Sequence, residues 1–145
     1  MFQRILVAVE PGKAHDPAVR LTGELARMTG AHVRVLHVAT TMIAADTAVR
    51  LEDDDTAQNV VDDAIAVLLG MGVDAQGELR RGLSQQVAQE ISAATEDFGA
   101  DLLVVSPHHR GSLAALLNPR VSDAVAHNSR IAVLLAPTDG MQSQD

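Results

Sequence analysis

The stretch Ile5-Leu-Val-Ala-Val9 is a short, continuous run of apolar residues that ends at Glu10-Pro11-Gly12. A run in which every position is apolar is typical of a strand buried on both faces of a parallel sheet. Asp16-Pro17 then supplies a helix N-cap and a proline at the first helical position, and Gly30 ends the helical spacing that follows. The start of the chain therefore predicts a strand followed by a helix.

The alternation of strand and helix continues along the chain. Apolar residues at helical spacing predict a second helix that follows the acidic run Glu52-Asp-Asp-Asp55 and ends at Gly70, and a third that begins at a Ser84 cap and ends at Phe98. Asn118-Pro119 marks the start of a fourth helix. Further strands are predicted at 33–38, 74–81, 102–105 and 131–136. This order specifies an α/β domain with a parallel, doubly wound sheet and helices on both faces.

The length of the chain, 145 residues, is close to the usual size of one domain, roughly 150 residues. We expect a single domain over residues 1–137 and a polar C-terminal tail over residues 138–145. No apolar run approaches the roughly 18 to 20 residues that span a bilayer, and the first residues do not resemble a secretory signal. The expected location is the cytoplasm.

Acidic residues outnumber basic ones by 19 to 11, so the formal net charge is −8 at pH 7. A surface of this sign repels nucleic acid and anionic membranes, and we expect neither as a partner. Cysteine is absent, which excludes disulfides, thiol nucleophiles and thiolate metal sites. Composition alone excludes these classes of protein without identifying a function.

The order of the elements, together with four short matches, resembles the universal stress protein family. The matches are Ile5-Leu-Val-Ala-Val9, Leu36-His37-Val38, Gly99-Ala-Asp-Leu-Leu-Val-Val105 and Val121-Ser-Asp123. The resemblance spans nearly the whole chain and implies the fold shared with adenine nucleotide alpha hydrolases. That fold is a five-stranded parallel sheet in the order 3-2-1-4-5, and it usually forms homodimers through the last strand.

The two edges of such a sheet differ in polarity in this chain. Residues 74–81 form a charged edge strand, and charges at an edge discourage further pairing. The opposite edge is apolar and would be an aggregation hazard if it were left bare. We expect a homodimer in which this strand pairs across a twofold axis, the alternative being a monomer whose edge is covered. The expected interface residues are Ile131, Val133, Leu134 and Leu135.

A ligand crevice in an open parallel sheet lies beyond the carboxyl ends of the strands where the strand order reverses, here between the first and fourth strands. ATP-binding members of the resembled family carry Gly-x2-Gly-x9-Gly-Ser/Thr after the fourth strand. In this chain those positions hold Ser106, His109, Pro119 and Arg120, and none of them matches. The expected rim of this vestigial nucleotide site consists of Glu10, Pro11, Gly12, Ser106, His108, His109, Arg110, Gly111, Pro119, Arg120, Val121 and Ser122.

The substitutions oppose phosphate binding for physical reasons. Pro119 lacks a backbone donor, and Asn118 can occupy the neighbouring amides as an N-cap. Side chains at Ser106 and His109 restrict backbone conformations that glycine permits. We therefore expect a dimeric stress-response protein that binds an unidentified protein partner or a small ligand, without an intact ATP-binding motif, a cofactor or enzymatic activity.

Arg110 and Arg120 favour an alternative, because two guanidinium groups near a crevice can hold an anion through side chains alone. The alternative function is an ATP- or AMP-binding member, possessing at most weak hydrolysis, that uses these arginines in place of the glycine loop. At the other rim, Glu10 stands where ATP-binding members typically have Asp.

A second match to the family contains two adjacent histidines. Val104-Val-Ser-Pro-His-His109 is similar to the founding universal stress protein A branch, which also lacks the glycine motif and is regarded as dimeric and not ATP-binding.

Adjacent histidines seldom converge on one ion, so we expect no metal site at His108 and His109. His37 lies in a predicted strand and is expected to be a satisfied core histidine. No oriented base accompanies Ser122, and no catalytic residue is expected.

Overall fold

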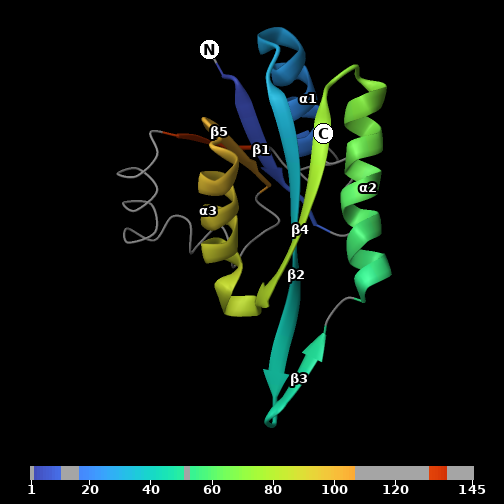
Figure 1. Cartoon of the computed structure of the whole chain (residues 1–145), viewed down its shortest axis with the longest axis vertical. Coiled ribbons are helices and arrows are strands. Elements are labelled where there is room, and N and C mark those ends of the chain that lie inside the picture. The colour runs from blue at the N-terminus through green and yellow to red at the C-terminus, as the bar shows by residue number, and fades with distance from the viewer. Residues whose placement is uncertain (1, 11–16, 51–52, 107–130, 137–145) are drawn as a thin grey trace, which may run out of the picture.

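A single sheet with helices on both faces forms the centre of the computed structural model (Figure 1). The structure describes residues 2–10, 17–50, 53–106 and 131–136, and the fourth helix predicted from Asn118 lies outside these ranges. In chain order the elements are β1 (Arg4–Ala8), α1 (Pro17–Thr29), β2 (His32–Ala44), β3 (Thr47–Arg50), α2 (Asp54–Gly70), β4 (Ala75–Leu83), the 3-10 turn η1 (Ser84–Gln86), α3 (Val87–Phe98), β5 (Leu102–Val105) and β6 (Ala132–Leu135).

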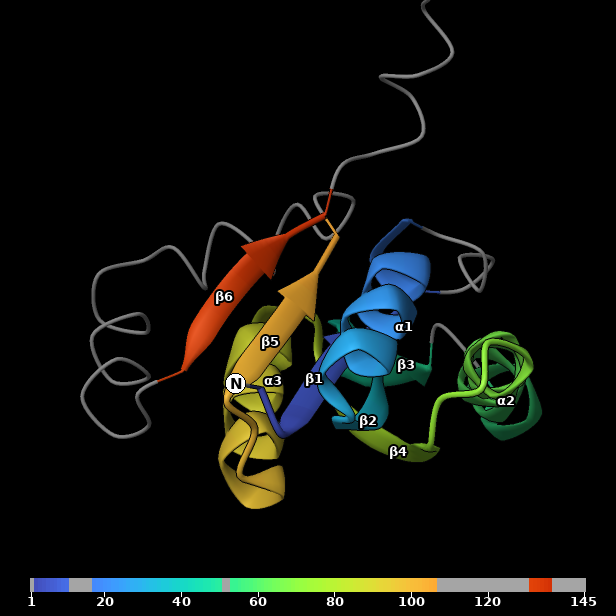
Figure 2. The same cartoon turned by 90° about the horizontal axis from the view of Figure 1, so that it is seen from above.

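The sheet has six strands and is mixed, so the prediction of five parallel strands in the order 3-2-1-4-5 is wrong. The five strands predicted from the sequence are present, and they pair in parallel in the order β4-β2-β1-β5-β6 (Figure 2). The additional strand, β3, runs antiparallel to the end of β2. The main path of the sheet is therefore β3-β2-β1-β5-β6, and β4 pairs with β2 beside it.

The additional strand exists because β2 continues to Ala44, well beyond its predicted end at Val38. The chain then turns back through Ala45 and Asp46, whose φ angles are 50° and 64°. Two successive residues with positive φ make the turn that matches the twist of a β-hairpin. Ala is uncommon in this left-handed geometry, and so the sequence carries no Asn-Gly or Gly-Gly signal from which the hairpin could be predicted.

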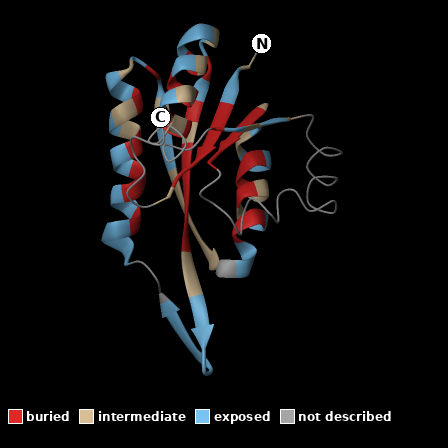
Figure 3. Cartoon of the chain, turned by 180° about the vertical axis from the view of Figure 1, so that it is seen from behind, coloured by how far each residue is buried: buried red, intermediate tan, exposed pale blue. Residues whose placement is uncertain are grey.

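Side chains alternate between two apolar layers, one on each face of the sheet. Ile5, Val7 and Val104 belong to the layer that packs against α1 and α2. Leu6 and Leu103 belong to the layer that packs against α3. The buried residues follow the central strands and the inner faces of the helices (Figure 3). This arrangement explains how the chain builds a core almost entirely from aliphatic side chains.

Side-chain hydrogen bonds accompany the start of α2 and the turn η1 that precedes α3. Asp53 is the N-cap of α2, and its carboxylate accepts a hydrogen bond from the Thr56 amide at 2.7 Å. The same bond holds the pKa of Asp53 below its ordinary value. The predicted Ser84 cap of the third helix is wrong, because Ser84 begins η1 and α3 starts at Val87. At that turn the Gln86 side chain accepts from the Leu83 amide, which satisfies the amide without a serine cap.

The edge strand β4 is charged, as predicted, and its charges are paired. Arg80 forms ion pairs with Glu78 on its own strand and with Asp97 on α3, the latter at 2.6 Å. Partial burial lowers the pKa of Arg80, but the hydrogen bonds that Arg80 donates to Glu78 and Asp97 outweigh it and raise the pKa above its ordinary value. Arg34 on β2 also contacts Glu78, at 3.2 Å. The Arg80–Asp97 pair attaches α3 to the edge of the sheet.

Helix α2 approaches β4 closely at Gly77. A Cβ atom at Gly77 would lie 2.8 Å from Ile65 Cδ1 and closer still to Val61 Cγ1. Gly70, at the end of α2, has open space around the corresponding position. The absence of a side chain at Gly77 therefore sets the distance between the helix and the sheet.

Replacement of Gly77 by Ala is expected to lower the free energy of unfolding by about 1 to 3 kcal/mol, because the added methyl group forces α2 away from β4. Gly70→Ala, the matched control, is expected to leave stability unchanged or raise it by up to about 1 kcal/mol through helix propensity. Urea unfolding followed by circular dichroism measures both. Equal effects of the two substitutions would contradict the close approach at Gly77.

Candidate functional site

The order of the strands reverses between β1 and β5. β1 pairs with β2 on one edge and with β5 on the other, so the chain leaves β1 in one direction and later returns to its opposite side (Figure 2). In open α/β sheets, ligands bind beyond the carboxyl ends of the strands at this switch point. The switch point between β1 and β5 therefore remains the candidate site.

Glu10 and Ser106 are the predicted rim residues that the structure describes. Val7 pairs with Val104, and the two rim residues follow a few positions later on the same two strands. Ser106 is 3% exposed and Glu10 is half-buried. The structure thus brings these two residues to neighbouring strand ends, as predicted. The other rim residues lie outside the described ranges: Pro11, Gly12, His108, His109, Arg110, Gly111, Pro119, Arg120, Val121 and Ser122.

His37 connects two strands next to this site. The side chain is 3% exposed, and its Nδ1 lies 2.9 Å from the carbonyl oxygen of Val9. Because a carbonyl only accepts, Nδ1 carries the proton in this bond. The ring therefore ties the carboxyl end of β1 to β2, and the interpretation of His37 as a satisfied core histidine is confirmed.

The β2–β3 hairpin lies at the carboxyl ends of the strands, as the candidate site does. The sequence analysis did not predict this hairpin. Thr41 pairs with Leu83 of β4 and also with Arg50 of β3, so β3 and β4 flank opposite edges of β2. β1 also lies on the edge opposite β4. β3 therefore extends beyond the carboxyl end of β1. The run Ala39-Thr-Thr-Met-Ile43 contains β-forming residues that favour a longer strand, but the turn has no comparable signal.

The predicted dimer strand is β6, at the end of the sheet path. Val133 and Leu135 are 50% and 45% exposed, whereas Leu134 and Ile131 are half-buried and pack against the two core layers. The apolar surface of this edge is thus made by Val133 and Leu135. The strand contains no charged residue.

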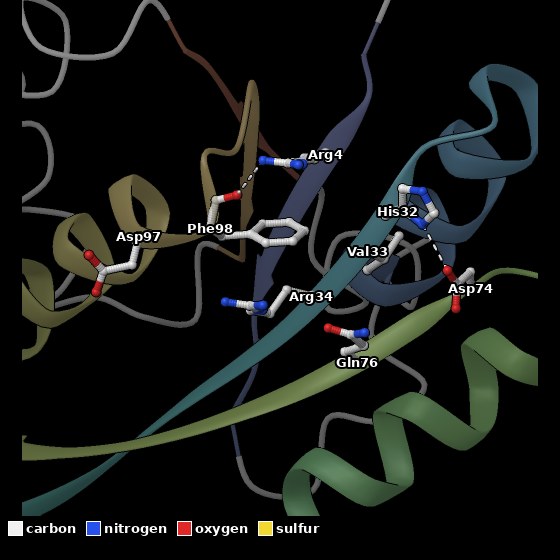
Figure 4. A pocket seen from close by; sticks show the side chains of 8 residues that line it. All are labelled: Arg4, His32, Val33, Arg34, Asp74, Gln76, Asp97 and Phe98. Carbon is white, nitrogen blue, oxygen red and sulfur yellow. Dashed lines mark hydrogen bonds and ion pairs between the residues drawn. The ribbon is translucent and has the colours of Figure 1, made fainter.

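A polar pocket of about 290 Å³ lies at the opposite, amino-terminal edge of the strands (Figure 4). The guanidinium carbons of Arg34 and Arg4 lie 4.4 and 6.0 Å from the centre of the Phe98 ring. Arg4 also donates to the Phe98 carbonyl at 3.2 Å, which caps the end of α3. His32 pairs with Asp74 at 2.7 Å. Because these groups satisfy one another, the pocket is best explained as a junction between α3 and the sheet.

Among the described residues, no cluster of His, Asp and Glu could hold a metal ion. In the same part of the chain, no helix is long and apolar enough to cross a membrane. The candidate site rests on the switch point of the sheet, where Glu10, Ser106 and the His37–Val9 contact lie at the carboxyl ends of the strands.

Replacement of His37 by Leu is expected to lower the free energy of unfolding by about 1 to 2 kcal/mol, because the buried Val9 carbonyl loses a donor. His37→Asn should retain more stability, since the Asn amide nitrogen can occupy a place near that of Nδ1. Urea unfolding at pH 7.5 measures both variants. A His37→Leu protein as stable as the wild type would show that the contact does not hold β1 to β2.

Comparisons with known proteins agree with this architecture. The sequence profile of the universal stress protein family matches residues 1–137. No curated protein matches the chain. The chain does resemble solved structures at low sequence identity, and this likeness concerns the fold alone.

A universal stress protein in complex with cAMP is 18% identical, with a TM-score of 0.66 over 94% of this chain and 97% of that one. The universal stress protein from Archaeoglobus fulgidus in complex with dAMP is 19% identical, with a TM-score of 0.64 over 92% and 97%. A family protein from Arabidopsis thaliana with AMP bound is 18% identical, with a TM-score of 0.59 over 97% and 94%. With its profile match over residues 1–137, this chain belongs to the universal stress protein family.

Proposed function

We propose that this universal stress protein is a homodimeric binding protein of the universal stress protein A type, which acts in the cytoplasm without ATP and without catalysis. The observation that carries the proposal is Ser106. Where ATP-binding relatives have the first glycine of their motif, this chain has a side chain that is 3% exposed, directly after β5. A side chain at this position restricts the backbone conformations by which glycine lets the chain approach a phosphate.

Three further positions of the motif support the same proposal from the sequence. Pro119 has no amide to donate, and His109 and Arg120 replace glycine and a hydroxyl residue. The formal charge of −8 adds an unfavourable field for a polyphosphate. A protein that has lost these donors acts through contacts with a partner and not through nucleotide chemistry.

A second candidate function is adenine nucleotide binding, and the solved structures with cAMP, dAMP and AMP favour it. In this alternative Arg110 and Arg120 hold the phosphate in place of the glycine loop. The switch-point position of Glu10 and Ser106 is compatible with both candidates. Direct binding measurements separate them.

Calorimetric titration of the purified protein with ATP at millimolar concentration is expected to give no saturable heat. A variant with the glycine motif restored, carrying Ser106→Gly, His109→Gly, Pro119→Gly and Arg120→Ser, is expected to bind ATP, because it regains the backbone amides that cradle phosphate. Micromolar binding by the wild type would overturn the proposal. Loss of that binding in Arg110→Ala would then establish the alternative.

Replacement of Val133 by Lys is expected to weaken the homodimer by at least about tenfold, because a twofold axis brings two ammonium groups into one apolar interface. Sedimentation equilibrium measures the dissociation constant. Met28→Lys is the matched control, since Met28 is 82% exposed on α1 and the change in charge is the same. A wild-type protein that sediments as a monomer, or equal effects of the two variants, would refute pairing through β6.

A further inference from the structure

The end of β2, the hairpin turn and β3 form an arm, residues 40–50, that projects from the body of the domain (Figures 1 and 3). All residues from 42 to 49 are exposed. Among them are three large apolar side chains, Met42, Ile43 and Val49, at 47%, 60% and 45% exposure. A two-stranded hairpin has marginal stability in water, so an apolar arm of this kind is suited to contact with another molecule.

The arm also offers an unprotected strand edge. Among the described strands, β3 pairs with β2 alone, and its other edge has no partner. The strand β4 shows how this chain closes an edge, with charged side chains at Glu78, Arg80 and Arg81. β3 has a single charged residue, Arg50, at its last position. Edges without charges or prolines are the ones that accept an additional strand.

Acidic residues stand close to this apolar edge. Asp53 follows Arg50 by three residues, so their Cα atoms lie within about 11 Å. Asp53, Asp54 and Asp55 are all exposed, and the Thr56 amide lowers the pKa of Asp53, which therefore carries its charge at neutral pH. Arg81 pairs with Asp54 and offsets only part of the charge. Asp46 in the turn adds a fourth acidic residue, so the acidic residues in and beside the arm outnumber the basic ones, Arg50 and Arg81.

The charge beside the arm distinguishes between two possible occupants of the β3 edge, a second copy of this chain and a different protein. A twofold contact between two β3 edges is antiparallel, so it would direct the Asp46 turn of each copy toward the Asp53–Asp55 end of the other, and each chain carries a formal charge of −8. A basic segment meets attraction at the same place. We propose that the arm docks an extended segment of a partner protein, which pairs along β3 and alternates apolar with basic side chains.

The geometry of the arm specifies how such a segment binds. Met42 and Val49 are paired opposite each other, so they form one apolar surface beside the free edge. The alternation expected of a hairpin with a two-residue turn directs the Ala48 amide toward that edge. Strand addition supplies main-chain hydrogen bonds, and the apolar and acidic neighbours supply specificity. A four-residue strand gives a small contact, which suits a transient interaction.

This inference gives a partner class to the proposed binding function, on which it rests. The two are nevertheless separable, because β3 and β6 lie at opposite ends of the main sheet path. A Val133→Lys protein that has lost its dimer should bind the segment as the wild type does. Conversely, ATP binding by the wild type would contradict the proposed function but would not contradict the inference about the arm.

The probe is a fluorescein-labelled octapeptide of alternating Lys and Val, titrated with the full chain and followed by fluorescence anisotropy at low salt. Saturable binding is expected, with loss of binding for a peptide of alternating Glu and Val. Ala48→Pro removes the outward amide, and Met42→Thr with Val49→Thr removes the apolar surface while keeping β-forming residues. Each should weaken binding by roughly tenfold or more, while Met28→Thr, on α1, should not.

Several results would overturn the proposal. Equal binding of the Lys and Glu peptides, or of the wild type and the Met42→Thr/Val49→Thr variant, would show that the arm does not select a basic strand. No saturable binding to the wild type would have the same meaning. Sedimentation of the wild type without peptide tests the second copy, because self-association that Ala48→Pro abolishes would make another copy of this chain the occupant.

Discussion

The burial of β1 between β2 and β5 is the constraint on which the rest of the domain depends. Ile5 and the two residues after it are fully buried, so the strand contributes to both apolar layers at once. Its start is held by Asp101, whose carboxylate accepts hydrogen bonds from the amides of Gln3 and Arg4 at 2.8 and 3.1 Å. The Asp101 carbonyl also accepts from Ala132 at 3.1 Å. One residue therefore aligns the starts of β1, β5 and β6.

The carboxyl ends of the strands are not aligned in this way, and the difference in strand length creates the features of that edge. β1 has five residues and β2 has thirteen, and their pairing ends at Ala8 and Leu36. Beyond this point β2 needs other partners on that side, because backbone groups in a strand must be satisfied. The His37 ring donates a hydrogen bond to the carbonyl of Val9, which follows β1. β3 pairs with residues 41–44 of β2. The arm is therefore a consequence of the length of β2.

The buried strands of the sheet could be predicted from the sequence, whereas the hairpin at the end of β2 could not. β5 was predicted with its observed bounds, because a strand buried on both faces appears as an unbroken apolar run. The switch-point rule placed Glu10 and Ser106 at neighbouring strand ends, since it needs only the order of the strands. The hairpin depends on Ala45 and Asp46 in a left-handed geometry, and Ala gives no signal for this geometry. The Phe98 pocket depends on contacts between α3 and distant strands, which no local pattern records.

The distribution of charge over the strand edges gives each edge a different capacity for association. β4 is closed by its ion pairs, with Arg80 held between Glu78 and Asp97. β6 has no charged residue of its own, so its strand lacks the charges that close β4. β3 has one charged residue, Arg50, and lies next to the acidic run Asp53–Asp55. The position of the charges along the strand edges therefore distinguishes these edges in a way that the net charge of −8 alone does not.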